Sequence, residues 1–160
     1  MNIEKILEYA LEREYEGKRF FWDNAERLRN AAAASAFRAI AAEEQKHIDF
    51  LAAQIAALNA GVPAQTPDLP PAGFFADRAQ SEHIAAAIDE SMIADLPVLR
   101  MAYLIERDFA EFYEMAAAKA EGEARQILEM LAKWEAGHER LFKRMHDELF
   151  EAYADMPWGG

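Results

Sequence analysis

The sequence contains no cysteine, which excludes disulfides, thiolate zinc sites, iron–sulfur clusters and cysteine nucleophiles. Histidine, glutamate and aspartate are then the only strong metal ligands available. Glycine and proline are also few, 7 and 6 among 160 residues, while 52% of the residues are hydrophobic. This composition excludes a disordered polymer and predicts one domain with a full hydrophobic core.

Positive charge is scarce as well. The chain has 17 basic and 29 acidic residues, a net charge of -12, so it repels phosphate backbones and anionic lipid. We therefore expect no nucleic-acid partner and no membrane partner. No apolar run reaches the roughly 18 residues of a transmembrane helix, and the first eight residues alternate in character, unlike a signal peptide. These absences predict a cytoplasmic protein.

Apolar residues recur at steps of three and four in four segments, which predicts four amphipathic helices. The breaks at 30–35 and 119–123 are short, and short connections make antiparallel neighbours. We expect an all-α fold, an antiparallel four-helix bundle over residues 1–153, followed by a tail at 154–160. The four apolar seams span residues 3–28, 37–58, 99–116 and 128–152.

A long connection, residues 61–94, separates the two predicted helical hairpins and begins with most of the prolines. Within it we expect a short extra helix at 81–90. Asp95 is then expected to be the N-cap of the third long helix, with Pro97 in its first turn. The Pro-rich part is either a plain crossover or a hinge for exchanging hairpins between chains.

Each predicted core seam carries a glutamate in its middle, and two seams carry a histidine three residues later. The paired glutamates are 30 residues apart in the first hairpin and 29 in the second, so the chain repeats. Residues at i and i+3 share one helix face, and the side chains should meet at one depth in the bundle. The six residues are Glu14, Glu44, His47, Glu106, Glu135 and His138.

Buried carboxylates without compensation cost several kcal/mol each, and a small domain has only about 5–15 kcal/mol of net stability. No lysine or arginine shares these seams with the glutamates. Two divalent ions would balance the four glutamates, so the charges favour a two-metal site. The alternatives are glutamates paired or solvated on a surface seam, and protonated glutamates in a purely structural bundle.

Four carboxylates and two imidazoles form a mainly hard, oxygen-rich ligand set. Iron and manganese fit such a set best, and zinc can occupy it in vitro. With bridging carboxylates, two ions about 3.5–4 Å apart are expected.

The segments 10–21, 42–51, 106–113 and 134–138 together resemble the ferritin-like superfamily, most closely the rubrerythrin-like ferritin-domain proteins. The resemblance covers nearly the whole chain apart from 61–94 and the last few residues. It implies two iron ions per chain, with Glu14 and Glu106 as the first ligand of each hairpin.

By the same resemblance, Glu44 and Glu135 bridge the ions, while His47 and His138 each bind one ion terminally. Tyr113 matches an aromatic position whose hydroxyl hydrogen-bonds a ligand carboxylate. The equivalent position in the first hairpin is Phe21, which has no hydroxyl, so the hydrogen bonding around the ligands should differ between the two hairpins.

Two departures from rubrerythrins limit what the resemblance implies. The chain has no cysteine-ligated rubredoxin iron, and Phe109 occupies the position of an extra glutamate. The six-ligand set is therefore more similar to bacterioferritin's oxidation centre, and a self-sufficient peroxidase is not expected.

The resulting hypothesis is a di-iron carboxylate oxidoreductase that oxidises Fe(II) with hydrogen peroxide or dioxygen. It would act either in peroxide detoxification under oxidative stress, with an external electron donor, or as a ferroxidase. The alternative is an iron-binding or iron-handling protein without rapid turnover. The tail is too short for ferritin's fifth helix, which argues against a 24-subunit cage, and a homodimer is expected instead.

Other polar residues have weaker patterns. Glu43 and Asp49 either hold a ligand histidine by its other ring nitrogen or are solvated on the helix exterior. His83 and His146 are expected to be surface histidines. Trp134, beside Glu135, is expected to close the site to water.

Overall fold

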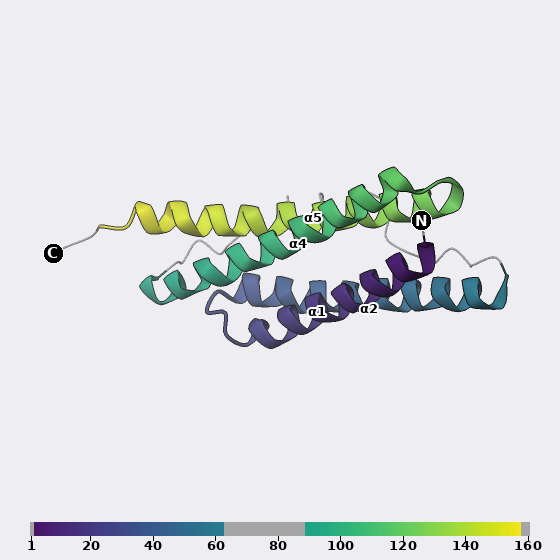
Figure 1. Ribbon diagram of the computed structural model, residues 1–160. Coiled ribbons are helices and arrows are strands. Elements are labelled where there is room, and N and C mark those ends of the chain that lie inside the picture. The colour runs from purple at the N-terminus through teal and green to yellow at the C-terminus, as the bar shows by residue number, and fades with distance from the viewer. Residues whose placement is uncertain (1, 63–88, 158–160) are drawn as a thin grey trace.

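The computed structural model describes residues 2–62 and 89–157, and within them the chain is helical without strands (Figure 1). The predicted all-α four-helix bundle is confirmed. In the described ranges, no helix is both long and apolar enough to cross a membrane. The elements are α1 (Ile3–Ala25), α2 (Ala31–Ala60), the 3₁₀ helix η1 (Glu90–Ala94), α4 (Asp95–Lys119) and α5 (Gly122–Ala154).

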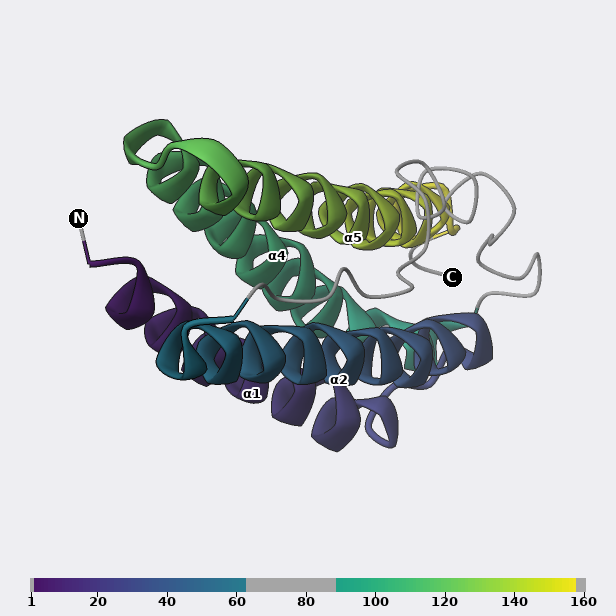
Figure 2. The same cartoon turned by 90° about the vertical axis from the view of Figure 1, so that its right-hand side faces the viewer.

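The helices form two hairpins, α1 with α2 and α4 with α5. One hairpin lies above the other in both views (Figures 1 and 2). The first break is shorter than predicted, because residues 31–35 already belong to α2. Asn30 caps that helix by accepting a hydrogen bond from the Ala33 backbone N–H at 3.0 Å. Gly122, within the second predicted break, is the first residue of α5, with a φ of 59°.

Asp95 does not cap its own helix, so that prediction is wrong. It is the first residue of α4, after Ala94 at the N-cap. Its buried carboxylate instead accepts hydrogen bonds from the backbone N–H of Arg29, at 2.8 and 3.0 Å, and of Asn30, at 2.7 Å. This ties the start of α4 to the α1–α2 connection. Pro97 lies in the first turn of α4, as predicted.

The core has apolar layers above and below the seam glutamates. Phe21, Phe37 and Phe142 form a fully buried aromatic cluster with centroids 5.1–5.2 Å apart. Leu58, predicted in a seam, is 46% exposed. It lies in the last turn of α2, where α1 has only its first residues, including Ile3, to cover it. The short helix expected at 81–90 lies outside the described residues, except for Asp89 and Glu90, the N-cap and first residue of η1.

Candidate metal centre

All four α-helices contribute to one polar cluster in the middle of the bundle. The seam periodicity that buries the apolar side chains also buries one glutamate from each helix, and the i, i+3 spacing adds a histidine on α2 and on α5. Each of the six side chains is 0% exposed. They are Glu14, Glu44, His47, Glu106, Glu135 and His138. The structure thus brings together all six candidate ligands.

The six residues form two overlapping groups, each able to surround one cation. In each group, one ligand atom per residue lies within 4.8 Å of all the others. Glu44 and Glu135 belong to both groups, because they come from the second helix of each hairpin and meet in the centre. One group adds Glu14 and His47, and the other adds Glu106 and His138.

Both histidines turn the same ring nitrogen, Nδ1, toward the carboxylates. His47 Nδ1 lies 2.9 Å from Glu135, 3.3 Å from Glu14 and 3.4 Å from Glu44. His138 Nδ1 lies 3.1 Å from Glu135, 3.3 Å from Glu44 and 3.5 Å from Glu106. Each imidazole therefore contacts glutamates of both hairpins, not only the one on its own helix.

The carboxylates are poorly satisfied by protein donors alone. Within the described parts of the chain, no well-directed hydrogen bond reaches either oxygen of Glu44, either oxygen of Glu106, or Oε1 of Glu135, although histidine ring nitrogens lie close to several of them. Buried acceptors of this kind are costly unless something positive neutralises them. A hard, oxygen-rich set with unsatisfied buried oxygens fits a pair of divalent cations such as iron or manganese.

Without metal, the pKa values divide the glutamates into two kinds. Burial, reinforced by the charge of Glu44, raises the pKa of Glu14 to about 8. Burial also raises the pKa of Glu106, although His138 opposes it. Burial acts the same way on Glu44 and Glu135, but other groups outweigh it and the pKa of each is lowered. For Glu44 these are hydrogen bonds with Glu14 and then the two histidines; for Glu135 they are the charge of His47 and hydrogen bonds with both histidines.

The histidines complete this charge balance. Burial lowers the pKa of an imidazole, but the surrounding glutamates outweigh burial at both histidines. The pKa of His47 is raised well above the usual range by Glu135 and Glu14. The pKa of His138 is raised likewise by Glu106, Glu135 and Glu44. At neutral pH two carboxylates and two imidazoles are then charged, and the cluster is neutral. Two divalent ions would give the same neutrality with all four glutamates ionised and both imidazoles neutral.

Tyr113 reaches the cluster from α4. Its hydroxyl donates a hydrogen bond to Oε1 of Glu14 on α1, and it is 1% exposed. Burial and the charge of Glu14 raise the pKa of Tyr113, so the phenol keeps its proton. Phe21, its repeat partner, packs in the aromatic cluster instead. The Tyr113 hydroxyl therefore supports only the ligand group that contains Glu14, and Phe21 gives no such hydrogen bond to the other group.

Several sequence candidates lie elsewhere. Asp49 is exposed and accepts from Gln45 at 2.8 Å, so for it the surface interpretation holds. Glu43 is buried and accepts from Lys46 at 3.2 Å, so it is neither solvated nor bonded to a ligand histidine. His146 is partly buried beside Asp147, its Nδ1 3.0 Å from that carboxylate. His83 lies outside the described residues.

Trp134 contributes more than its position beside Glu135 indicated. The side chain is 4% exposed, and its ring stacks on His47 of the other hairpin, with ring centroids 4.9 Å apart. Sequence periodicity places Trp134 next to a ligand of α5, but the contact with α2 depends on how the hairpins cross.

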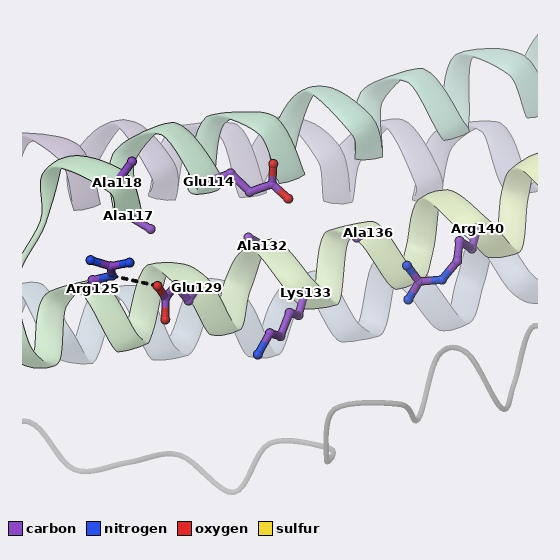
Figure 3. A pocket seen from close by; sticks show the side chains of 9 residues that line it. All are labelled: Glu114, Ala117, Ala118, Arg125, Glu129, Ala132, Lys133, Ala136 and Arg140. Atoms are coloured by element: carbon purple, nitrogen blue, oxygen red, sulfur yellow. Dashed lines mark hydrogen bonds and ion pairs between the residues drawn. The ribbon is translucent and has the colours of Figure 1, made fainter.

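A groove of about 660 Å³ lies on the outside of α4 and α5 (Figure 3). Alanines form much of its lining, and Arg125 pairs with Glu129 at 2.8 Å along its edge. None of the six clustered residues lines it, so it is separate from the candidate metal centre. Its lining residues are Glu114, Ala117, Ala118, Arg125, Glu129, Ala132, Lys133, Ala136 and Arg140.

Comparisons with known proteins agree with this fold. The profile of the rubrerythrin family matches residues 5–146. A search of curated proteins found no match. Among solved structures, a hypothetical protein from Pyrococcus furiosus is similar, with a TM-score of 0.70 and 21% identity over 95% of this chain and 92% of that one. At that identity the likeness shows the fold alone.

Proposed function

This chain belongs to the rubrerythrin family, and from that premise we propose that its six clustered side chains bind two iron ions. The observation that carries the proposal is the pair of overlapping ligand groups that share Glu44 and Glu135. Two carboxylates common to both groups are what a two-metal site requires, whereas a single-ion site would leave one group unused.

In this proposal, Glu14 and His47 hold one ion, Glu106 and His138 hold the other, and Glu44 and Glu135 lie between them. The imidazoles bind through Nδ1, the nitrogen that already faces the carboxylates. Manganese satisfies the same ligand chemistry, and zinc can occupy such a site in vitro.

The proposed activity is that of an oxidoreductase. When bound, two ferrous ions would supply the two electrons that, together with two protons from solvent, reduce one hydrogen peroxide to two water molecules, or that begin the reduction of dioxygen. The chain's own residues arrange the site for this chemistry. Phe21, Phe37 and Phe142 close one side against water, and the Tyr113 hydroxyl fixes the orientation of Glu14.

Repeated peroxide reduction requires an external electron donor, because the chain contains no cysteine to ligate a rubredoxin iron. Repeated ferrous oxidation requires only a supply of Fe(II). A homodimeric assembly and a cytoplasmic location are further parts of the proposal. Light scattering of the purified protein tests the first of these.

The test is anaerobic loading of the metal-free protein with Fe(II), followed by separate mixing with peroxide and with air. Two ions per chain are expected, and the absorbance of ferric iron follows the reaction. A faster reaction with peroxide supports detoxification, whereas fast reaction with air and repeated ferrous loading supports ferroxidase activity. Two bound ions with neither reaction would indicate an iron-handling protein.

The variant Glu106→Ala should lose two-ion loading, because it removes a ligand from one group. Glu111→Ala is the matched control, since Glu111 is an exposed residue one turn further along α4. Two tightly bound ions in the Glu106 variant would refute the assignment of that ligand.

A further inference from the structure

Three aromatic rings form a stack that runs between the hairpins. Trp134 of α5 stacks on His47 of α2 with centroids 4.9 Å apart and ring planes 26° apart. His47 in turn stacks on His138 of α5, with centroids 5.8 Å apart and planes 10° apart. His47 is therefore in stacking contact with two rings of the opposite hairpin.

No described protein group gives His47 the second hydrogen bond that a metal-binding histidine usually makes. Such a histidine normally donates its second ring N–H to a carboxylate, carbonyl or water, which fixes the ring orientation. Here Nδ1 faces the glutamates, while Nε2 is buried and has no hydrogen-bond partner within the described ranges. Glu43 and Asp49, the acidic residues outside the cluster that lie close to His47 in sequence, bond to Lys46 and Gln45 instead.

A face contact can fix the ring where a hydrogen bond does not. The χ2 torsion of histidine is broad, so packing has to select the ring plane. The indole of Trp134 is large, is itself 4% exposed, and lies on α5 directly before Glu135. Rotation of the His47 ring about χ2 would turn its edge into the indole face.

We propose that Trp134 is a positioning residue for His47, which sets the imidazole plane by stacking and so directs Nδ1 toward the metal pair. The inference rests on the proposed function. Because Trp134 supports one histidine, its loss should weaken one ion and leave the other, held by Glu106 and His138, unaffected. Loss of a general packing residue would instead weaken both ions through the fold.

The test uses Co(II) as the probe, titrated anaerobically into the metal-free full chain. Trp134→Leu removes the flat face but keeps an apolar side chain, and Trp134→Phe keeps an aromatic face. Trp22→Leu is the matched control, since Trp22 is 62% exposed on α1. Calorimetry gives the two affinities, and the cobalt absorption bands report the ligand geometry of each ion.

We expect Trp134→Leu to lower the affinity for one Co(II) by about 10- to 100-fold, the usual effect of losing outer support of a ligand. The second affinity should be unchanged, and Trp134→Phe should restore the first affinity and its absorption bands. Wild-type affinities in the leucine variant, or an equal loss of both ions in both variants, would overturn the inference.

A second measurement does not depend on how well the leucine variant folds. In the variant Trp22→Phe/Trp158→Phe, Trp134 is the single remaining tryptophan. Its fluorescence should be quenched in step with the binding of one of the two Co(II) ions. An unquenched signal overturns the inference, whereas failure of the wild type to bind two Co(II) ions would overturn the proposed function instead.

Discussion

The phenol of Tyr113 on α4 donates a hydrogen bond to Oε1 of Glu14 on α1, so one hairpin supplies the support for a candidate ligand of the other. Both groups are fully buried, and neither has access to water as a substitute partner. The bond therefore couples the packing of the two hairpins to the geometry of the candidate metal centre.

Replacing Tyr113 by phenylalanine should destabilise the metal-free protein. The change leaves a buried carboxyl oxygen without its donor, which costs about 1–3 kcal/mol in the free energy of unfolding. Urea denaturation measures it. Tyr103→Phe is the control on the same helix, because Tyr103 contacts Arg107 and Lys143 through its ring face, which phenylalanine retains. Equal stability of the Tyr113 variant and the wild type would contradict the prediction.

Glutamine substitutions at the four glutamates should separate into two classes. Glu14→Gln and Glu106→Gln each alter one ligand group, so each variant should keep one tight ion. Glu44→Gln and Glu135→Gln alter both groups, and these variants should bind neither ion tightly. Anaerobic calorimetry with Fe(II) gives the stoichiometry. If all four variants lose the same number of ions, then Glu44 and Glu135 are not shared ligands.

Metal affinity should rise steeply with pH. Ligands must lose their protons to bind metal. In the metal-free cluster four groups have a raised pKa, and each holds one proton that metal binding displaces: Glu14, Glu106, His47 and His138. The pKa of Glu14 is about 8. Binding two ions near pH 6 should therefore release about four protons. Calorimetry in buffers of different ionisation enthalpy counts them. A pH-independent affinity between pH 6 and 8 would contradict this charge assignment.

The stability of the metal-free protein should change with pH in the opposite direction. Folded Glu14 keeps a proton up to a pKa of about 8, whereas the unfolded chain loses it near 4.5, so stability falls as pH rises across that window. His47 and His138, whose pKa values are raised above 6.5, add losses at higher pH. Each differing proton contributes a slope of about 1.4 kcal/mol per pH unit.

Below pH 4.5 the sign reverses, because the lowered pKa values of Glu44 and Glu135 favour folding only while those groups are ionised. Thermal unfolding of the metal-free protein should thus show an optimum near pH 4.5, the ordinary pKa of a glutamate. The Glu14→Gln variant should have a shallower decline above that optimum. A wild-type protein whose stability increases from pH 6 to 8 would show that Glu14 is ionised in the folded state.

The convergence of the six side chains could be predicted from sequence because helix periodicity is strict. Each seam has one glutamate, and two of the glutamates are followed three residues later by a histidine. When the four seams face a common core, these side chains must meet there. The direction of the imidazoles could not be predicted this way. That His47 Nδ1 lies closest to Glu135, on the opposite hairpin, depends on how the helices cross.

Asp95 and Phe109 show where local rules give way to tertiary packing. Aspartate is a preferred N-cap, but three hydrogen bonds to the backbone of the α1–α2 connection hold the Asp95 carboxylate instead.

The sequence shows that Phe109 occupies the position of an extra glutamate. It does not show the space for that residue: an ideal Cβ on Gly17 would lie 2.8 Å from Phe109 Cε2, so the missing side chain of that glycine makes room for the ring.

The most direct test of the central claim is a crystal structure of the anaerobically Fe(II)-loaded protein, with anomalous diffraction recorded at the iron edge. Two anomalous peaks about 3.5–4 Å apart are expected, both in contact with Glu44 and Glu135. One peak should also contact Glu14 and His47, and the other Glu106 and His138. An iron-loaded crystal with no anomalous peak among these six side chains would contradict the account.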